Sequence, residues 1–178
     1  MKKILAFAGS NSPVSINQTL VETTANLIDF AEVDVISLRS FSVHFYDVEQ
    51  EKKEGIPEKM IELNSILSQY EGFILATPEH NGIPPAFFLN TLDWLSRVNR
   101  NIFNDKPTLL MSTSTGFKGG EGALKILESV IPRFGAKVVK SHAFPSFNHN
   151  LKDLEIINPD ELIKMKEVLS SFRTELNS

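Results

Sequence analysis

The strongest constraint on the fold is a regular alternation of short apolar runs with segments of helical periodicity. Strands that alternate with helices form a parallel sheet with helices on both faces. The 178 residues therefore predict one domain, residues 1–178, built as an α/β three-layer sandwich with the parallel strand order 2-1-3-4-5. We expect strands at residues 3–8, 32–38, 72–77, 108–111 and 136–140, and helices at 17–30, 56–70, 84–95, 123–134 and 159–176.

The first connection, residues 9–20, has the composition of an anion site. It follows an apolar strand, carries the hydroxyls of Ser10, Ser12, Ser15 and Thr19, and leads into a helix whose N-terminus has a partial positive charge. It lacks the later glycines of G-x-G-x-x-G and the G-K-[ST] ending of a P-loop. A loop rich in hydroxyls and poor in glycine is suited to a mononucleotide phosphate such as that of FMN. The alternative is that Ser15 or Asn17 only caps the helix.

Two further polar connections are expected at the same edge, because the carboxyl ends of parallel strands share one edge of the sheet. Residues 78–85 contain three prolines, which restrict the backbone so that its polar groups can hold the edge of a flavin. Residues 112–120 combine hydroxyls with glycines, and glycine allows close approach to a flat ring. For each connection taken alone, ordinary turn chemistry is the alternative.

Composition and missing motifs exclude several other classes. A net charge of −4 gives no reason to expect nucleic-acid binding, and the absence of cysteine excludes disulfides and thiolate metal sites. No stretch approaches the roughly 18 apolar residues of a membrane span, so we expect a cytoplasmic protein. The chain has no G-x-S-x-G string, and its four histidines lack metal-ligand spacing, so no metal is expected. A response regulator needs an acidic pair after its first strand and an aspartate at the end of its third. This chain has Gly9-Ser10 and Thr77-Pro78 at those places, which excludes that class.

Two regions remain open from the residues alone. Residues 39–55 have no clean period and are expected to form a long loop, a feature that is often functional. Glu79 and Asp93 form a candidate pair of catalytic carboxylates, but a surface or capping role is favoured for Asp93.

With these residues placed, nearly the whole chain resembles the NADPH-dependent FMN reductase family of flavodoxin-like proteins. The family's G-S-x-R-x-x-S-x-N loop appears as residues 9–17, and its S-x-G-x-x-G-G appears as residues 114–120. Its P-E-Y-N motif, continuing to N-x-x-D-W, appears as residues 78–81 and 90–94.

The chain departs from the family pattern at several positions. Ser12 replaces the arginine of the first loop, which removes a charge-assisted phosphate contact and predicts weaker FMN binding. His80 replaces the tyrosine of P-E-Y-N and is a weak catalytic candidate as a proton donor, with passive packing favoured. Ile83, Ala86 and Leu89 make the following stretch more apolar than in the family.

The resemblance implies an FMN-dependent oxidoreductase in which NADPH or NADH passes hydride through the flavin to a quinone, azo, flavin or metal-oxyanion acceptor. It implies ping-pong kinetics and a homodimer or homotetramer. The sequence identifies no 2′-phosphate clamp, and Lys118 and Arg97 are candidates for one only because they belong to the right loop and helix. An electron carrier, or a degenerate member with weak or no FMN binding, is the alternative. The cofactor-binding residues expected are Ser10, Ser12, Ser15, Asn17, Gln18, Thr19, Pro78, Glu79, His80, Asn81, Gly82, Ser112, Ser114, Gly116 and Gly119.

Overall fold

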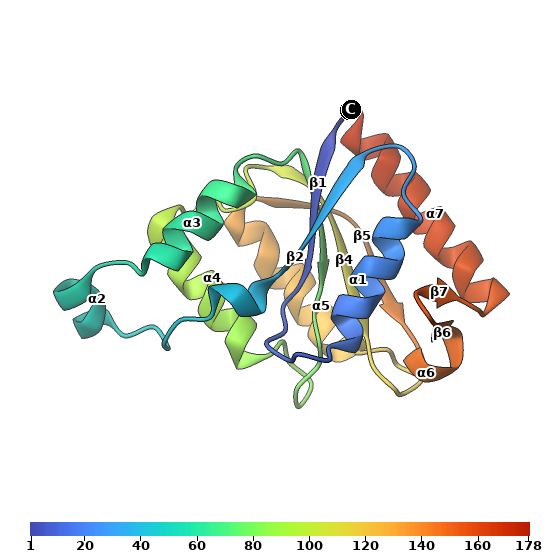
Figure 1. Cartoon of the computed structure of the whole chain (residues 1–178), viewed down its shortest axis with the longest axis horizontal. Coiled ribbons are helices and arrows are strands. Elements are labelled where there is room, and N and C mark those ends of the chain that lie inside the picture. Colours follow the sequence, from blue (N-terminus) through green and yellow to red (C-terminus); the bar gives the residue numbers. More distant parts are fainter.

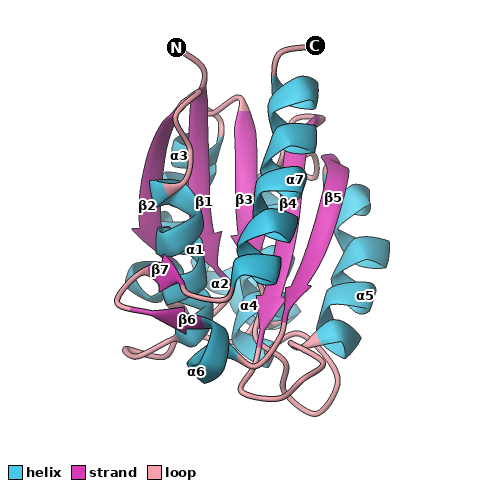
Figure 2. Ribbon diagram, turned by 90° about the vertical axis from the view of Figure 1, so that its right-hand side faces the viewer, coloured by secondary structure: helices cyan, strands magenta, loops and turns pink.

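The computed structural model describes all 178 residues and confirms the predicted sheet. Five strands pair in parallel in the order β2-β1-β3-β4-β5. Their amino ends lie at the edge where both termini of the chain emerge, and the long connections follow their carboxyl ends at the opposite edge (Figure 2). The strands are β1 (Lys3–Ala8), β2 (Glu32–Ser37), β3 (Gly72–Ala76), β4 (Lys106–Thr113) and β5 (Ala136–Phe144).

Helices cover both faces of the sheet, so that it forms the middle of three layers (Figures 1 and 2). One core lies between the sheet and α1 (Ile16–Asn26) together with α7 (Pro159–Leu176). The other lies between the opposite face and α3 (Glu58–Leu67), α4 (Ala86–Val98) and α5 (Glu121–Val130). The three central strands are buried on both faces, which explains why they read as unbroken apolar runs. None of the helices combines the length and apolarity needed to cross a membrane.

Several element boundaries differ from the prediction. Helix α1 ends at Asn26 and not at residue 30, because the amides of Leu27 and Ile28 bond only three residues back and the chain then turns toward β2. Strands β4 and β5 are longer than their apolar runs, since their pairing continues to Thr113 and Phe144. The added parts of β4 and β5 contain polar residues, so a search for apolar runs does not detect them.

The prediction of a structureless loop over residues 39–55 is wrong. A 3₁₀ helix, η1 (Leu38–Phe41), follows β2, and α2 (Val48–Glu54) stands away from the body of the molecule (Figure 1). Asp47 caps α2 by accepting from the amides of Glu49 and Gln50. No residue of α2 is buried, so its sequence has no hydrophobic periodicity from which a helix could be predicted.

Two other connections also contain short elements. Helix α5 ends at Val130 and passes into a 3₁₀ helix, η2 (Ile131–Phe134), whose first turn contains Pro132. Between β5 and α7, where a plain loop was expected, the chain forms α6 (Phe147–Asn150) and a hairpin of β6 (Leu151–Lys152) with β7 (Glu155–Ile156).

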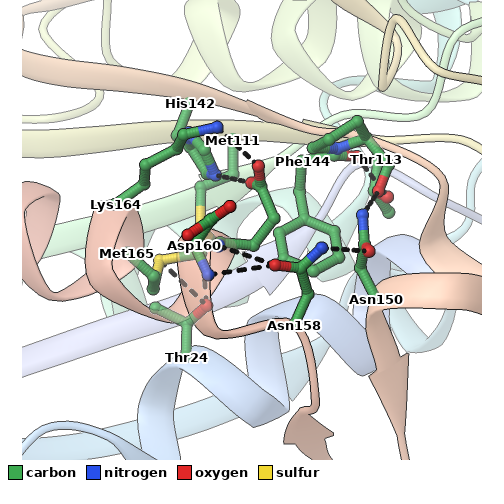
Figure 3. A network of polar contacts seen from close by, with 12 residues as sticks. Thr24, Met111, Thr113, His142, Phe144, Asn150, Asn158, Asp160, Lys164 and Met165 are labelled. Carbon is green, nitrogen blue, oxygen red and sulfur yellow. Dashed lines mark hydrogen bonds and ion pairs between the residues drawn. The ribbon is translucent and has the colours of Figure 1, made fainter.

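A polar network joins the end of β5 to the first turn of α7 (Figure 3). Glu161 is only 4% exposed, and its carboxylate lies 2.7 Å from Lys164 Nζ and 3.5 Å from His142 Nε2. Burial lowers the pKa of His142, with a further lowering from Lys164, and the carboxylate of Glu161 opposes both effects. His142 is therefore held neutral to a lower pH than a histidine in the unfolded chain.

This pKa shift predicts a loss of stability on acidification. Above the ordinary histidine pKa of about 6.5 the ring is neutral in both states, whereas below it the unfolded chain takes up the proton first. The free energy of unfolding should therefore fall between about pH 7.5 and 5.5, and His142→Gln should remove part of that fall. Urea unfolding at several pH values in this range measures the free energy of unfolding of both proteins. The exposed His149 provides the matched control, and equal pH dependence in the wild type and His142→Gln would contradict the prediction.

Candidate functional site

Three polar connections meet at the carboxyl edge of the sheet, as the sequence predicts. They are residues 9–15 after β1, residues 77–85 after β3 and residues 114–120 after β4. The amide of Gly9 donates to the carbonyl of Ala76 at 2.8 Å, and the amide of Thr77 donates to that of Met111 at 2.9 Å. The first two connections therefore begin at the same level, and β4 continues two residues further, to Thr113, before the third begins. Because the chain leaves β1 and β3 in opposite directions along the sheet, the site lies at its topological switch point.

The first connection folds around its own hydroxyls. Ser10 Oγ and Ser12 Oγ each accept from the amide two residues later, both at 3.2 Å, and Ser15 caps α1 by accepting from the amide of Gln18. The amides of Ile16 and Asn17 in the first turn of α1 have no partner within the protein. A cavity of about 210 Å³ opens here, lined by Ser10, Asn11, Ser12, Val14, Ser15, Ile16, Asn17, Pro78, His80 and Pro85.

Three side chains predicted to bind the cofactor are engaged inside the protein. Asn17 is 2% exposed and pairs with the backbone of Thr113, donating to its carbonyl and accepting from its amide, both at 3.0 Å. Gln18 accepts from the amide of Ala8 and donates to the carbonyl of Ile36, and Thr19 donates to the carbonyl of Ser15. Asn17 and Gln18 thus join the start of α1 to β1, β2 and β4, whereas Thr19 bonds within its own helix turn. Direct contact with a cofactor stays a prediction for all three.

The second connection is a tight hairpin. His80 and Ile83 exchange both backbone hydrogen bonds, and Asn81 and Gly82 between them have φ values of 54° and 84°. Positive φ at both central residues is the geometry of a type I′ turn, for which Asn-Gly is the preferred pair. Glu79 accepts from the amide of Ala123 at 3.0 Å and so satisfies the N-terminus of α5. The exposed His80 side chain makes no hydrogen bond and lines the cavity described above.

The third connection leaves several backbone amides free. Ser112 is buried and donates to the carbonyl of Gly120, while Ser114 donates to that of Gly116 at 3.4 Å. Gly119 lies against the end of β5 with a φ of 59°. The amides of Thr115 and Gly116 have no protein partner. Exposed backbone donors and a glycine with open space around it allow a flat ring to approach.

A fourth segment, which lies within residues 39–55 and supplied no predicted site residue, completes the site. We call residues 42–47, between η1 and α2, the strap. Asn90 accepts from the amide of Tyr46 and donates to the carbonyl of His44, to which the indole of Trp94 also donates, at 2.7, 3.0 and 3.0 Å. Asn90, a polar residue between the apolar Leu89 and Leu92 of α4, was the available signal. The strap borders a cavity of about 310 Å³ lined by Asn11, Ser42, Val43, Phe45, His80, Pro85, Ala86, Phe87 and Asn90.

The donor set fits FMN. The two cavities share Asn11, His80 and Pro85, so they adjoin, and we call the pair the groove; one end is rich in hydroxyls and the other has aromatic walls. Hydroxyls and free amides at the first end are ligands for a phosphate, and the second end suits an aromatic ring system. Arg97, a candidate for a 2′-phosphate clamp, is instead engaged by Glu51 at 2.8 Å, whereas the ammonium of Lys118 lies over the exposed ring of Phe117. No cluster of three or more His, Asp or Glu side chains lies close enough to hold a metal ion.

Comparison with known proteins places the chain in a family. The family model for NADPH-dependent FMN reductase matches residues 2–149, and the chain belongs to this family. The NADH:(hydroxy)cinnamate reductase subunit CrdA of Vibrio ruber is 26% identical over 177 residues, covering 94% of this chain and 84% of that subunit. The quinone reductase of Escherichia coli K12 is 27% identical, covering 80% of this chain and 76% of that protein.

Solved structures support the same fold. FerB, a flavoenzyme NAD(P)H:(acceptor) oxidoreductase from Paracoccus denitrificans, superposes with a TM-score of 0.81 at 18% identity, covering 99% of this chain and 98% of FerB. The protein is thus a flavodoxin-like oxidoreductase of the class that uses FMN as cofactor and NAD(P)H as electron donor.

Proposed function

We propose that the protein is an NAD(P)H:acceptor reductase for small, flat, electron-poor molecules of the quinone class, with azo compounds, free flavins and metal oxyanions as further acceptors. FMN held in the groove would supply the two-electron hydride chemistry that connects NAD(P)H with the acceptor. A single groove serves both substrates, which favours a ping-pong order in which the nicotinamide leaves before the acceptor enters. The observation that carries the proposal is the pair of adjoining cavities, one with phosphate ligands and the other with aromatic walls.

The protein residues have the tasks of binding and orientation. The hydroxyls of Ser10, Ser12 and Ser15, with the free amides of α1, hold the phosphate. The free amides of residues 115–116 and the hairpin at Asn81-Gly82 hold the polar edge of the ring. We assign His80 a packing role beside the ring, because hydride chemistry on a flavin needs no protein acid.

Exposed apolar side chains on the connections point to self-association. Phe45 lines the groove, Ile83 lies in the second connection and Phe117 in the third, and they are 69%, 47% and 79% exposed. Large exposed apolar side chains at one edge of a protein are typical of an interface. We therefore propose a homodimer or homotetramer with the groove near the contact, and a cytoplasmic location, which agrees with the absence of cysteine.

The visible spectrum tests the proposed function. The protein is incubated with excess FMN, passed through a gel-filtration column, and treated anaerobically with NADPH or NADH. We expect a yellow protein that either nucleotide bleaches and that benzoquinone turns yellow again. Yellow protein that neither nucleotide bleaches would identify an electron carrier, and colourless protein would identify a degenerate member. Initial rates at several fixed NADPH concentrations are expected to give parallel double-reciprocal lines, and intersecting lines would exclude the ping-pong order.

A further inference from the structure

The phosphate end of the groove contains no cationic side chain of its own. Between Gly9 and Leu20 the chain has neither lysine nor arginine, and the donors of this connection are hydroxyls and amides. A guanidinium adds a full positive charge and can form two parallel hydrogen bonds to a phosphate, which hydroxyls and amides cannot do. A cation close to this connection therefore has a large influence on how tightly a phosphate is held.

A third cavity lies on the other side of the first connection. It has a volume of about 330 Å³ and shares Ser12, Val14 and Ser15 with the cavity at the phosphate end. Its opposite wall is formed by the chain that follows β2. Its lining residues are Ser12, Pro13, Val14, Ser15, Gln18, Thr19, Glu22, Ser37 and Arg39. Arg39 is its single basic residue.

The fold fixes the backbone of Arg39 beside the connection. Strand β2 is the neighbour of β1, and their last residues, Ser37 and Ala8, are partners in the register. Leu38 is 1% exposed and anchors the first turn of η1, so Arg39 leaves the sheet one residue later at the same edge. Gln18 holds α1 to both strands through Ala8 and Ile36. The distance between the connection and η1 is therefore set by hydrogen bonds and packing.

The guanidinium of Arg39 is uncommitted. It makes no ion pair or hydrogen bond, in contrast to Arg97, whose Nε lies 2.8 Å from Glu51. The other charged group of the cavity is Glu22, whose carboxylate already accepts from Gln18 Nε2 at 3.5 Å. A long, exposed side chain on a fixed backbone, next to two serines of the phosphate end, has both the freedom and the position to turn toward an anion.

We propose that Arg39 supplies the positive charge for the FMN phosphate, reaching it across Ser12 and Ser15 from the end of β2. This inference rests on the proposed placement of the phosphate at the first connection. Arg39 is a binding residue in this assignment and has no part in hydride transfer. It compensates for the neutral side chains of the connection itself.

Comparing two flavins tests the assignment without measuring turnover. Riboflavin lacks the phosphate, so a residue that acts on the phosphate changes the affinity for FMN and leaves that for riboflavin unchanged. Titrations followed by quenching of flavin fluorescence give both dissociation constants. For Arg39→Ala we expect FMN affinity to fall about ten-fold or more, which is the usual effect of losing a hydrogen bond to a charged group. The riboflavin constant is expected to stay as in the wild type.

Three further variants make the result specific. Arg133→Ala removes an exposed arginine from η2 and should change neither constant. Arg39→Lys should keep part of the preference for FMN over riboflavin, because it keeps the charge without the planar fork. Adding Ser12→Arg to Arg39→Ala should restore the preference by placing a guanidinium on the connection.

The outcomes separate this assignment from the proposed function. A wild-type protein that binds FMN, together with an Arg39→Ala variant that has an unchanged preference for FMN over riboflavin, would overturn the role of Arg39 alone. A wild-type protein that binds neither flavin would overturn both proposals. Loss of FMN and riboflavin affinity to the same extent in Arg39→Ala would also contradict the assignment, since it would show a general effect on the groove.

Discussion

Replacing Asn17 by alanine is expected to lower the free energy of unfolding by about 2–4 kcal/mol. The side chain is 2% exposed and makes two hydrogen bonds of 3.0 Å to Thr113, one to its amide and one to its carbonyl. Without it, both backbone groups stay buried and lose their partners, and each such orphan costs about 1–3 kcal/mol. Urea denaturation of the flavin-free protein measures the change directly.

Asn11→Ala is the matched control for this prediction. Asn11 lies in the same connection, is exposed and makes no side-chain hydrogen bond, so its removal should change stability by less than about 0.5 kcal/mol. Equal effects of the two substitutions would contradict the structural role of Asn17. A large loss of FMN affinity in Asn17→Ala with unchanged stability would instead support direct contact between Asn17 and the cofactor.

The sequence was sufficient for the sheet, and the reason is visible in the strands themselves. Residues of β1 and β3 are apolar on both faces, so these strands are identified by composition alone, and the alternation with helices makes them parallel. The order 2-1-3-4-5 was chosen as one of the two common orders of such sheets. The three polar connections were placed correctly for the same reason. Their position depends on the order of the strands and on no contact distant in sequence.

Contacts between residues far apart in sequence were beyond such reasoning. The partner of Asn17 lies 96 positions away, and the strap is held by Asn90 across 44 positions. The strap and α2 expose most of their residues, so they carry no apolar period. Arg39 could not be identified as a candidate from the sequence. It lies near the first connection only because β2 pairs with β1, which brings the end of β2 beside the loop that follows β1.

The largest loss of stability is expected for Gly119→Ala. Gly119 has a φ of 59°, and a Cβ there would lie 2.6 Å from the carbonyl oxygen of Phe144 and 2.7 Å from its carbon. The left-handed conformation costs about 1–2 kcal/mol for a residue with a Cβ, and the overlap adds about 1–3 kcal/mol. The overlap involves backbone at the end of β5, where Thr113 Oγ1 also donates to the same carbonyl, so no flexible side chain can yield. We expect a total loss of about 2–5 kcal/mol in urea unfolding.

Gly116→Ala separates this local effect from a general intolerance of the third connection. Gly116 does not have a positive φ, and its Cβ would meet only Ser114 Oγ, at 3.7 Å, which is ordinary contact. Its replacement should cost less than about 0.5 kcal/mol. If Gly119→Ala were equally mild, the close packing of the connection against β5 would be wrong. If the stability loss is confined to Gly119, that glycine fixes the position of the connection. The open space at Gly116 then lies where a flat ring can approach the free amides of residues 115–116.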